Sequence, residues 1–158
     1  MKIFSPISKS IQIAIFQDEK TSGTDGGGST AGAFNVRTLN TTVVNNISGA
    51  SLASDTITLP AGTYRVKARS PVFIVGKHQL RLRNTTDATT TIVGISGYTD
   101  STDAVQVDGT LMGRFTITAT KDFQLQHYTE LTRATNGLGS DSTSGEVEVY
   151  AVIEIIKD

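Results

Sequence analysis

The sequence of 158 residues contains no cysteine and no tryptophan, and it has only two histidines. Without cysteine the chain cannot form a disulfide framework, hold a metal through thiolates or use a cysteine nucleophile. A zinc site would need both histidines and a carboxylate, but His127 falls on a core-facing strand position and His78 near a turn, where we expect it to be solvated. No serine lies in the Gly-x-Ser-x-Gly context of a hydrolase. The sequence therefore predicts a protein that is not an enzyme and that binds neither metal nor cofactor.

An excess of charge of one sign and long apolar runs are also missing. Lys and Arg total 14 against 15 Asp and Glu, a formal net charge of −1, so the whole chain has no electrostatic attraction to nucleic acid or to an anionic membrane. No run approaches the roughly 18 apolar residues of a membrane span, and residues 1–10 lack the apolar stretch of a signal peptide. We therefore expect no nucleic-acid partner, no membrane partner and synthesis in a cytosol.

Small hydroxyl side chains are abundant instead, with 24 Thr and 14 Ser in the chain. Threonine favours strands and serine favours turns. Short runs of period-two alternation, clearest over residues 63–69, are separated by clusters of Gly, Pro, Asn, Asp and Ser, and no long window has the period of an amphipathic helix. The sequence predicts an all-β protein with an N-terminal arm, residues 1–10, and a single domain, residues 11–158.

Two local arrangements follow from the same pattern. Residues 114–120 and 123–128 alternate on either side of a short polar segment and are predicted to pair as a hairpin. The polar, glycine-rich segments 21–30 and 137–145 are predicted to be flexible insertions.

The last strand, residues 146–156, is apolar on both of its faces. One face carries Val147, Val149, Ala151, Ile153 and Ile155, and the other mixes Glu146, Glu148 and Glu154 with Tyr150, Val152 and Ile156. A strand that is apolar on both faces is normally covered on both. In a chain of one domain, we expect the second cover to be another subunit.

Four segments, taken in order, resemble the tumour necrosis factor and complement globular-head superfamily. They are IAIF at 13–16, FNV at 34–36, TITLPAGTY at 56–64 and the apolar C-terminal strand. The resemblance implies a jelly-roll β-sandwich that assembles as a homotrimer, with aromatic residues near the three-fold axis. It makes Tyr128 and Tyr150 candidates for the trimer interface, beside Val152 and Ile156 of the two-sided strand.

The same resemblance bears on a basic block in residues 56–86, which hold six basic residues and no acidic one. In the superfamily topology Arg65, Lys67 and Arg69 lie beside the C-terminal strand, so we expect them to pair with its glutamates. The strand that carries Lys77, Arg81 and Arg83 lies in the other sheet, and its outward arginines are candidates for an acidic partner surface. No aromatic residues are interleaved with these basic residues, which argues against nucleic acid.

The phrases GKHQLRLRN, GRFTITATKDFQLQHY and GEVEVYAVIEIIKD resemble jelly-roll domains in structural proteins of tailed bacteriophages, particularly those that infect cyanobacteria. The chain has neither a signal peptide nor a collagen-like or membrane stalk, which argues against a receptor-ligand or complement role. The resemblance therefore implies a non-enzymatic virion structural protein that is assembled in the host cytoplasm.

Two roles in the virion remain open. A capsid decoration, or cement, protein could sit directly on the major capsid protein as a trimer and stabilise the phage head. The alternative is a receptor-binding knob of a tail fibre or spike that recognises a host surface glycan, but such a knob needs a stalk, and only about ten residues precede the first strand. We prefer decoration, with a capsid-docking arm that uses Lys2, Ile3, Phe4, Ile7 and Lys9.

Overall fold

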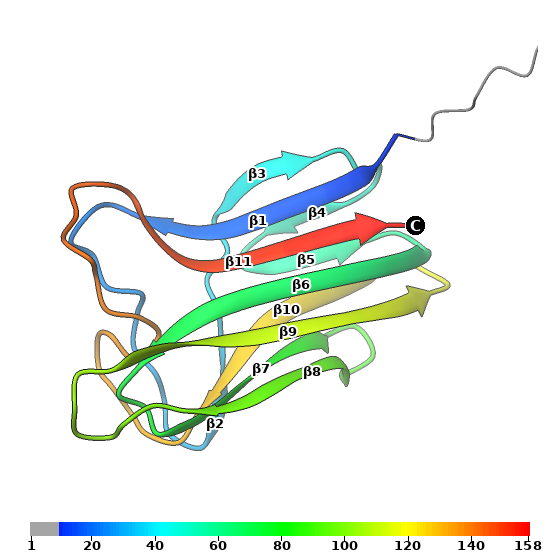
Figure 1. Cartoon of the computed structure of the whole chain (residues 1–158). Helices are drawn as coiled ribbons and strands as arrows, with labels where there is room; N and C mark the ends of the chain where they lie inside the picture. Colours follow the sequence, from blue (N-terminus) through cyan, green and yellow to red (C-terminus); the bar gives the residue numbers. More distant parts are fainter. Residues whose placement is uncertain (1–9) are drawn as a thin grey trace, which may run out of the picture.

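Strands alone build the part of the chain that the computed structural model describes, residues 10–158 (Figure 1). The strands are β1 (Gln12–Lys20), β2 (Ala33–Val36), β3 (Thr41–Asn45), β4 (Ser51–Ala53), β5 (Thr56–Leu59), β6 (Gly62–Phe73), β7 (Lys77–Asn84), β8 (Thr89–Tyr98), β9 (Gln106–Ile117), β10 (Lys121–Thr129) and β11 (Glu148–Lys157). Within these residues no helix is long and apolar enough to cross a membrane.

The strands form two antiparallel sheets that pack face to face as a jelly-roll sandwich (Figure 1). One sheet has five strands in the order β3-β1-β11-β6-β9. The other has the order β4-β5-β10-β7-β8, and β2 joins it by pairing with the second half of β10 while β5 pairs with the first. The all-β jelly roll predicted from the sequence is confirmed.

The core lies between the sheets and follows the alternation of each strand. In β6, Tyr64, Val66 and Ala68 are buried while the intervening basic side chains are exposed, as the sequence predicts. The hydroxyl of the fully buried Tyr64 donates a hydrogen bond to the carbonyl of Pro60 at 2.6 Å. Its polar end is thereby satisfied, and the ring contributes only apolar area to the core.

The predicted hairpin between residues 114–120 and 123–128 is wrong. Strands β9 and β10 lie in different sheets, and the segment between them crosses the sandwich. Phe115 and Phe123 meet across the core with ring centroids 5.3 Å apart. Two strands with inward-facing apolar side chains show the same alternation whether they pair within one sheet or face each other across the core from different sheets.

The two glycine-rich segments, 21–30 and 137–145, predicted to be flexible insertions, pack on each other. The Gly26 amide donates to the Gly139 carbonyl at 2.8 Å, and the Leu138 amide donates to the Gly27 carbonyl at 3.0 Å. A Cβ at Gly26 would lie 2.4 Å from the Leu138 oxygen. The glycines therefore allow two backbones to approach closely at one end of the sandwich.

Candidate assembly surface

The outer face of the five-stranded sheet carries the half-covered apolar residues of β11. Asp18 lies opposite Ala151 while Glu19 lies opposite Val149, so a β-bulge places one extra residue, Tyr150, in β11. The bulge shifts the alternation. Val152, Glu154 and Ile156 point outward as the sequence predicts, but Val149 joins them, while Glu148 and Tyr150 turn inward.

Tyr150 is therefore not available to a partner subunit in this conformation. It is 3 % exposed, and its hydroxyl donates to the Thr24 carbonyl at 2.8 Å. Burial, followed by the surrounding carboxylates, raises the pKa of this phenol. Tyr128 lies on the other sheet, where its ring meets Phe34 edge-on at 5.6 Å. Of the four predicted interface residues, the structure brings only Val152 and Ile156 together on one face.

A groove of about 580 Å³ runs from this face to the edge of the sandwich, where β9 and β8 lie next to each other. Its lining comes from four strands: Lys67, Ala68 and Arg69 of β6, Val93, Gly94 and Ile95 of β8, Thr110, Leu111 and Met112 of β9, and Val152 and Glu154 of β11. Ile95 and Met112 are 72 % and 73 % exposed. Two large apolar side chains so open to water, beside an apolar groove, mark a candidate interaction surface.

A second hollow, of about 300 Å³, adjoins the first on the same face and shares Arg69 and Val152 with it. It extends over the bulged part of β11, where Val149 is 48 % exposed, and is closed by Pro71 and Gln106. We call this hollow together with the groove the assembly surface. The exposed residues of β8 and β9 were missed as site residues in the sequence, although the alternation of residues 106–117 would have assigned Met112 to the outward face.

The basic side chains of β6 point outward beside β11, but their predicted pairing with its glutamates is wrong. Arg65 forms an ion pair with Asp158 at 2.8 Å, and Arg69 pairs with Asp108. Lys67 lies opposite Glu154, yet no ion pair joins them in residues 10–158. The bulge accounts for part of the difference, because it turns Glu148 inward.

Glu148 instead accepts hydrogen bonds from the loops at the end of the sandwich. Its carboxylate accepts hydrogen bonds from the amides of Ser142 and Gly23 at 3.1 and 3.3 Å and from the Ser142 hydroxyl. Burial opposes ionisation of this group, but these hydrogen bonds outweigh it, so the pKa of Glu148 is lowered overall.

The predicted acidic-partner residues lie on β7 in the six-stranded sheet. Lys77 is paired with Glu130 at 3.4 Å, and Arg81 and Arg83 point outward from the sandwich as expected. The predicted capsid-docking residues, Lys2, Ile3, Phe4, Ile7 and Lys9, fall outside the described part of the chain.

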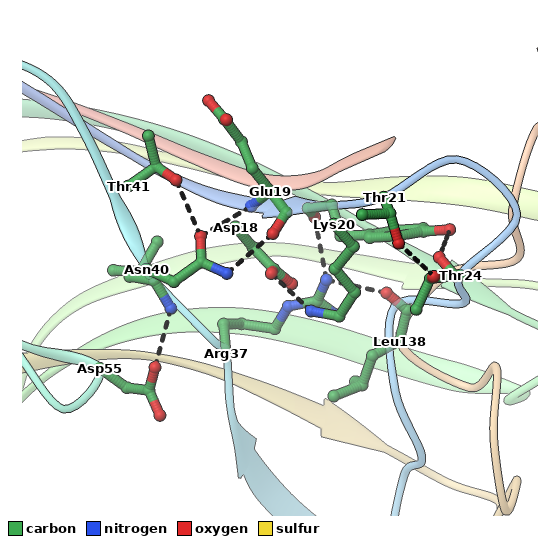
Figure 2. Close-up of polar contacts among 12 residues, drawn as sticks. Asp18, Glu19, Lys20, Thr21, Thr24, Arg37, Asn40, Thr41, Asp55 and Leu138 are labelled. Atoms are coloured by element: carbon green, nitrogen blue, oxygen red, sulfur yellow. Dashed lines mark hydrogen bonds and ion pairs between the residues drawn. The ribbon is translucent and has the colours of Figure 1, made fainter. Parts of the chain in front are cut away.

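Arg37 is a buried cation that no sequence pattern revealed. It is 0 % exposed, and its guanidinium donates to the carbonyls of Pro71, Leu138 and Tyr150 at 3.1, 2.8 and 2.9 Å. Figure 2 shows the group reaching from the segment after β2 toward Leu138, next to Asp18 and Lys20 of β1. Burial lowers the pKa of Arg37 to about 10, while the charge of Asp18 acts in the opposite direction. The side chain remains a cation at neutral pH and joins the glycine-rich segment 137–145, through Leu138, to β6 and β11 of the sandwich.

The two histidines form a buried pair, which corrects the prediction that His78 is solvated. His78 is 2 % and His127 0 % exposed, and His78 Nδ1 lies 3.1 Å from His127 Nε2. The other ring nitrogens have no partner in residues 10–158. Gly97 of β8 and Gly109 of β9 press against the rings, since a Cβ at either position would lie 2.4 or 2.7 Å from an imidazole atom. The packed position predicted for His127 is confirmed.

Comparisons with known proteins bear on the fold. No protein-family model matches the sequence, and no curated protein matches it. Among solved structures, murine APRIL at pH 5.0 is similar with a TM-score of 0.60 at 11 % identity, covering 94 % of this chain and 100 % of that one. The globular domain of the zebrafish complement 1qA protein is similar with a TM-score of 0.58 at 12 % identity, covering 91 % and 94 %. The chain has the jelly-roll fold of the tumour necrosis factor-like and complement globular domains.

Proposed function

We propose that the protein is a trimeric, non-enzymatic structural component of a virion that decorates a phage head. The observation that carries the assembly part of this proposal is the exposed apolar edge of β8 and β9 next to the apolar face of β11. The virion part is supported by the sequence resemblance to phage structural proteins, and the jelly-roll fold is compatible with it.

The assembly surface has two unlike parts, which favours a ring over a two-fold dimer. One part is the edge formed by β8 and β9, which carries the exposed Ile95 and Met112 on one side of the groove, and the other is the β11 face, which carries Val152 and, in the adjoining hollow, Val149. Contact between the edge of one subunit and the face of the next is heterologous, and heterologous contacts form a ring where the rotation between subunits closes and an open filament where it does not. A ring of three is the assembly that the superfamily resemblance implies.

Replacing Met112 with glutamate should dissociate the assembly without unfolding the chain. Met112 is 73 % exposed in the single chain, so the new carboxylate is hydrated there, whereas burial in a subunit contact would cost several kcal/mol. We expect a dissociation constant at least 100-fold higher, measured by light scattering during size exclusion. Val36→Glu, on the other sheet, is the matched control and should leave the mass unchanged. A wild-type chain that is monomeric at micromolar concentration would contradict the proposed trimer.

The capsid role is tested by offering the purified protein separately to phage heads that lack it and to intact host cells. Saturable uptake by heads alone supports decoration, whereas uptake by cells alone supports the alternative of a receptor-binding knob. Removal of residues 1–10 should abolish uptake by heads, because the proposed docking side chains of the arm are lost. The chain should still be trimeric, with the circular dichroism spectrum of the wild type. Undiminished uptake by the truncated trimer would contradict docking through the arm.

A further inference from the structure

The outer face of the six-stranded sheet carries a ladder of amide and arginine side chains. Arg81 Nε and Nη2 both donate to Gln126 Oε1, at 2.9 and 2.7 Å. Gln126 Nε2 donates in turn to Gln124 Oε1 at 3.0 Å, and Gln124 Nε2 reaches the Thr56 hydroxyl at 3.4 Å. The ladder crosses from β7 over β10 to β5 and fixes the orientation of Arg81.

The positive charge on this face has no acidic partner. Neither Arg81 nor Arg83 takes part in an ion pair within residues 10–158, and the single acceptor of the Arg81 fork, Gln126 Oε1, is neutral. Asp122 is the acidic residue of β10 on the same face, and it accepts from the Thr58 hydroxyl at 2.7 Å instead. Burial and the neighbouring charge of Arg83 lower the pKa of Arg81. An anion at this position would relieve that repulsion.

The Arg81 guanidinium also contacts an aromatic ring. The Arg81 guanidinium lies over the Phe34 ring, 3.6 Å from its centroid, and Phe34 packs edge-on against Tyr128. Tyr128 is half-buried, and its hydroxyl makes no hydrogen bond within the described residues. The surface therefore presents a cation, carboxamides, a free phenol and aromatic edges side by side.

We propose that this face, formed by Arg81, Arg83, Gln124 and Tyr128, binds an anionic polysaccharide. The Gln124 carboxamide and the Tyr128 phenol match sugar hydroxyls, the Tyr128 ring matches the apolar face of a sugar, and the two arginines match carboxylate or sulfate groups. The chemistry of this face argues against an acidic protein as the partner. A protein partner would place apolar side chains in a hollow, and both hollows described above open over β6 and β11 of the other sheet. The inference does not depend on the capsid role.

The test is direct binding of the full-length protein to fluorescently labelled oligosaccharides, measured as the change in their fluorescence polarisation. The probes are a heparin-derived sulfated oligosaccharide, a polygalacturonate-derived carboxylated one, neutral dextran and poly-glutamate. We expect saturable, salt-sensitive binding of at least one anionic oligosaccharide and none of dextran. Arg81→Met with Arg83→Gln should weaken it at least tenfold, and Arg83→Gln alone, which breaks no hydrogen bond in the described structure, should weaken it severalfold.

The matched control is Arg65→Gln with Arg114→Gln, which removes the same charge from the other sheet. Its binding should remain within twofold of the wild type. An equal loss of affinity in this control would show that binding depends only on the overall charge of the protein, which would overturn the proposal. Absence of saturable binding to either anionic oligosaccharide would overturn it as well. Poly-glutamate bound as tightly, with the same dependence on Arg81 and Arg83, would identify an acidic polypeptide as the ligand. All of these outcomes leave the capsid-binding assay unaffected.

Discussion

Replacing Arg37 with methionine should lower the free energy of unfolding by about 3–5 kcal/mol. Methionine fills much of the space but donates nothing, so the carbonyls of Pro71, Leu138 and Tyr150 lose their donors while they remain buried. The neighbouring Asp18 carboxylate, itself 0 % exposed, also loses a nearby positive charge. Urea denaturation monitored by tyrosine fluorescence would measure the loss.

The effect should be strongest where Arg37 joins the loops to the sandwich. Hydrogen exchange is expected to accelerate in residues 21–30 and 137–145, because the guanidinium bonds Leu138 directly (Figure 2). Arg65→Met, which removes an exposed arginine paired with Asp158, is the control and should leave the unfolding midpoint close to that of the wild type. An unchanged midpoint in Arg37→Met would show that this cation does not stabilise the fold.

Much of the fold was predictable because alternation reports burial strand by strand. The pattern of residues 63–69 assigned the core face of β6 correctly, and the resemblance placed β6 beside β11, as the register shows. Alternation does not report which sheet a strand joins, so β9 and β10 were paired wrongly. It also fails at a bulge, because one inserted residue reverses every later side chain, and Tyr150 was assigned to the wrong face for this reason.

The polar interior was the least predictable part. Arg37 lies outside any apolar alternation, whereas His78 shares the inward face of its strand with Leu80 and Leu82. Each is held by a contact distant in sequence, Arg37 with Leu138 and His78 with His127. No local pattern encodes such a contact. The assembly surface was predicted in part. The apolar character of both faces of β11 predicted that Val152 is covered by a partner. The groove is also lined by β8 and β9, and their position next to β6 and β11 follows from the sheet order, which the alternation does not reveal.

The protein should lose stability as the pH falls below about 6.5, before its carboxylates titrate. Burial lowers the pKa of His78, and it lowers that of His127 further, with the charges of Arg37 and His78 adding to the effect. Above pH 6.5 the histidines are neutral in both the folded and the unfolded chain, so they do not lower the free energy of unfolding. Below it the unfolded chain takes up protons that the folded chain resists, so unfolding is favoured, by up to about 1.4 kcal/mol per pH unit for His127 alone.

The window between pH 6.5 and 5 isolates the histidines, because the hydrogen-bonded carboxylates of Asp158, Glu130 and Glu148 have lowered pKa values and stay ionised there. Urea midpoints across this range should fall steeply for the wild type and less steeply for His127→Gln, which removes one of the two proton acceptors. Because that variant fills a fully buried site and could fold poorly, proton NMR of the wild-type imidazoles gives an independent test. Rings that titrate near pH 6.5 in the folded protein would contradict the buried pair. Rings that stay neutral to pH 5 would support the buried pair, packed under Gly97 and Gly109, as the source of the acid sensitivity.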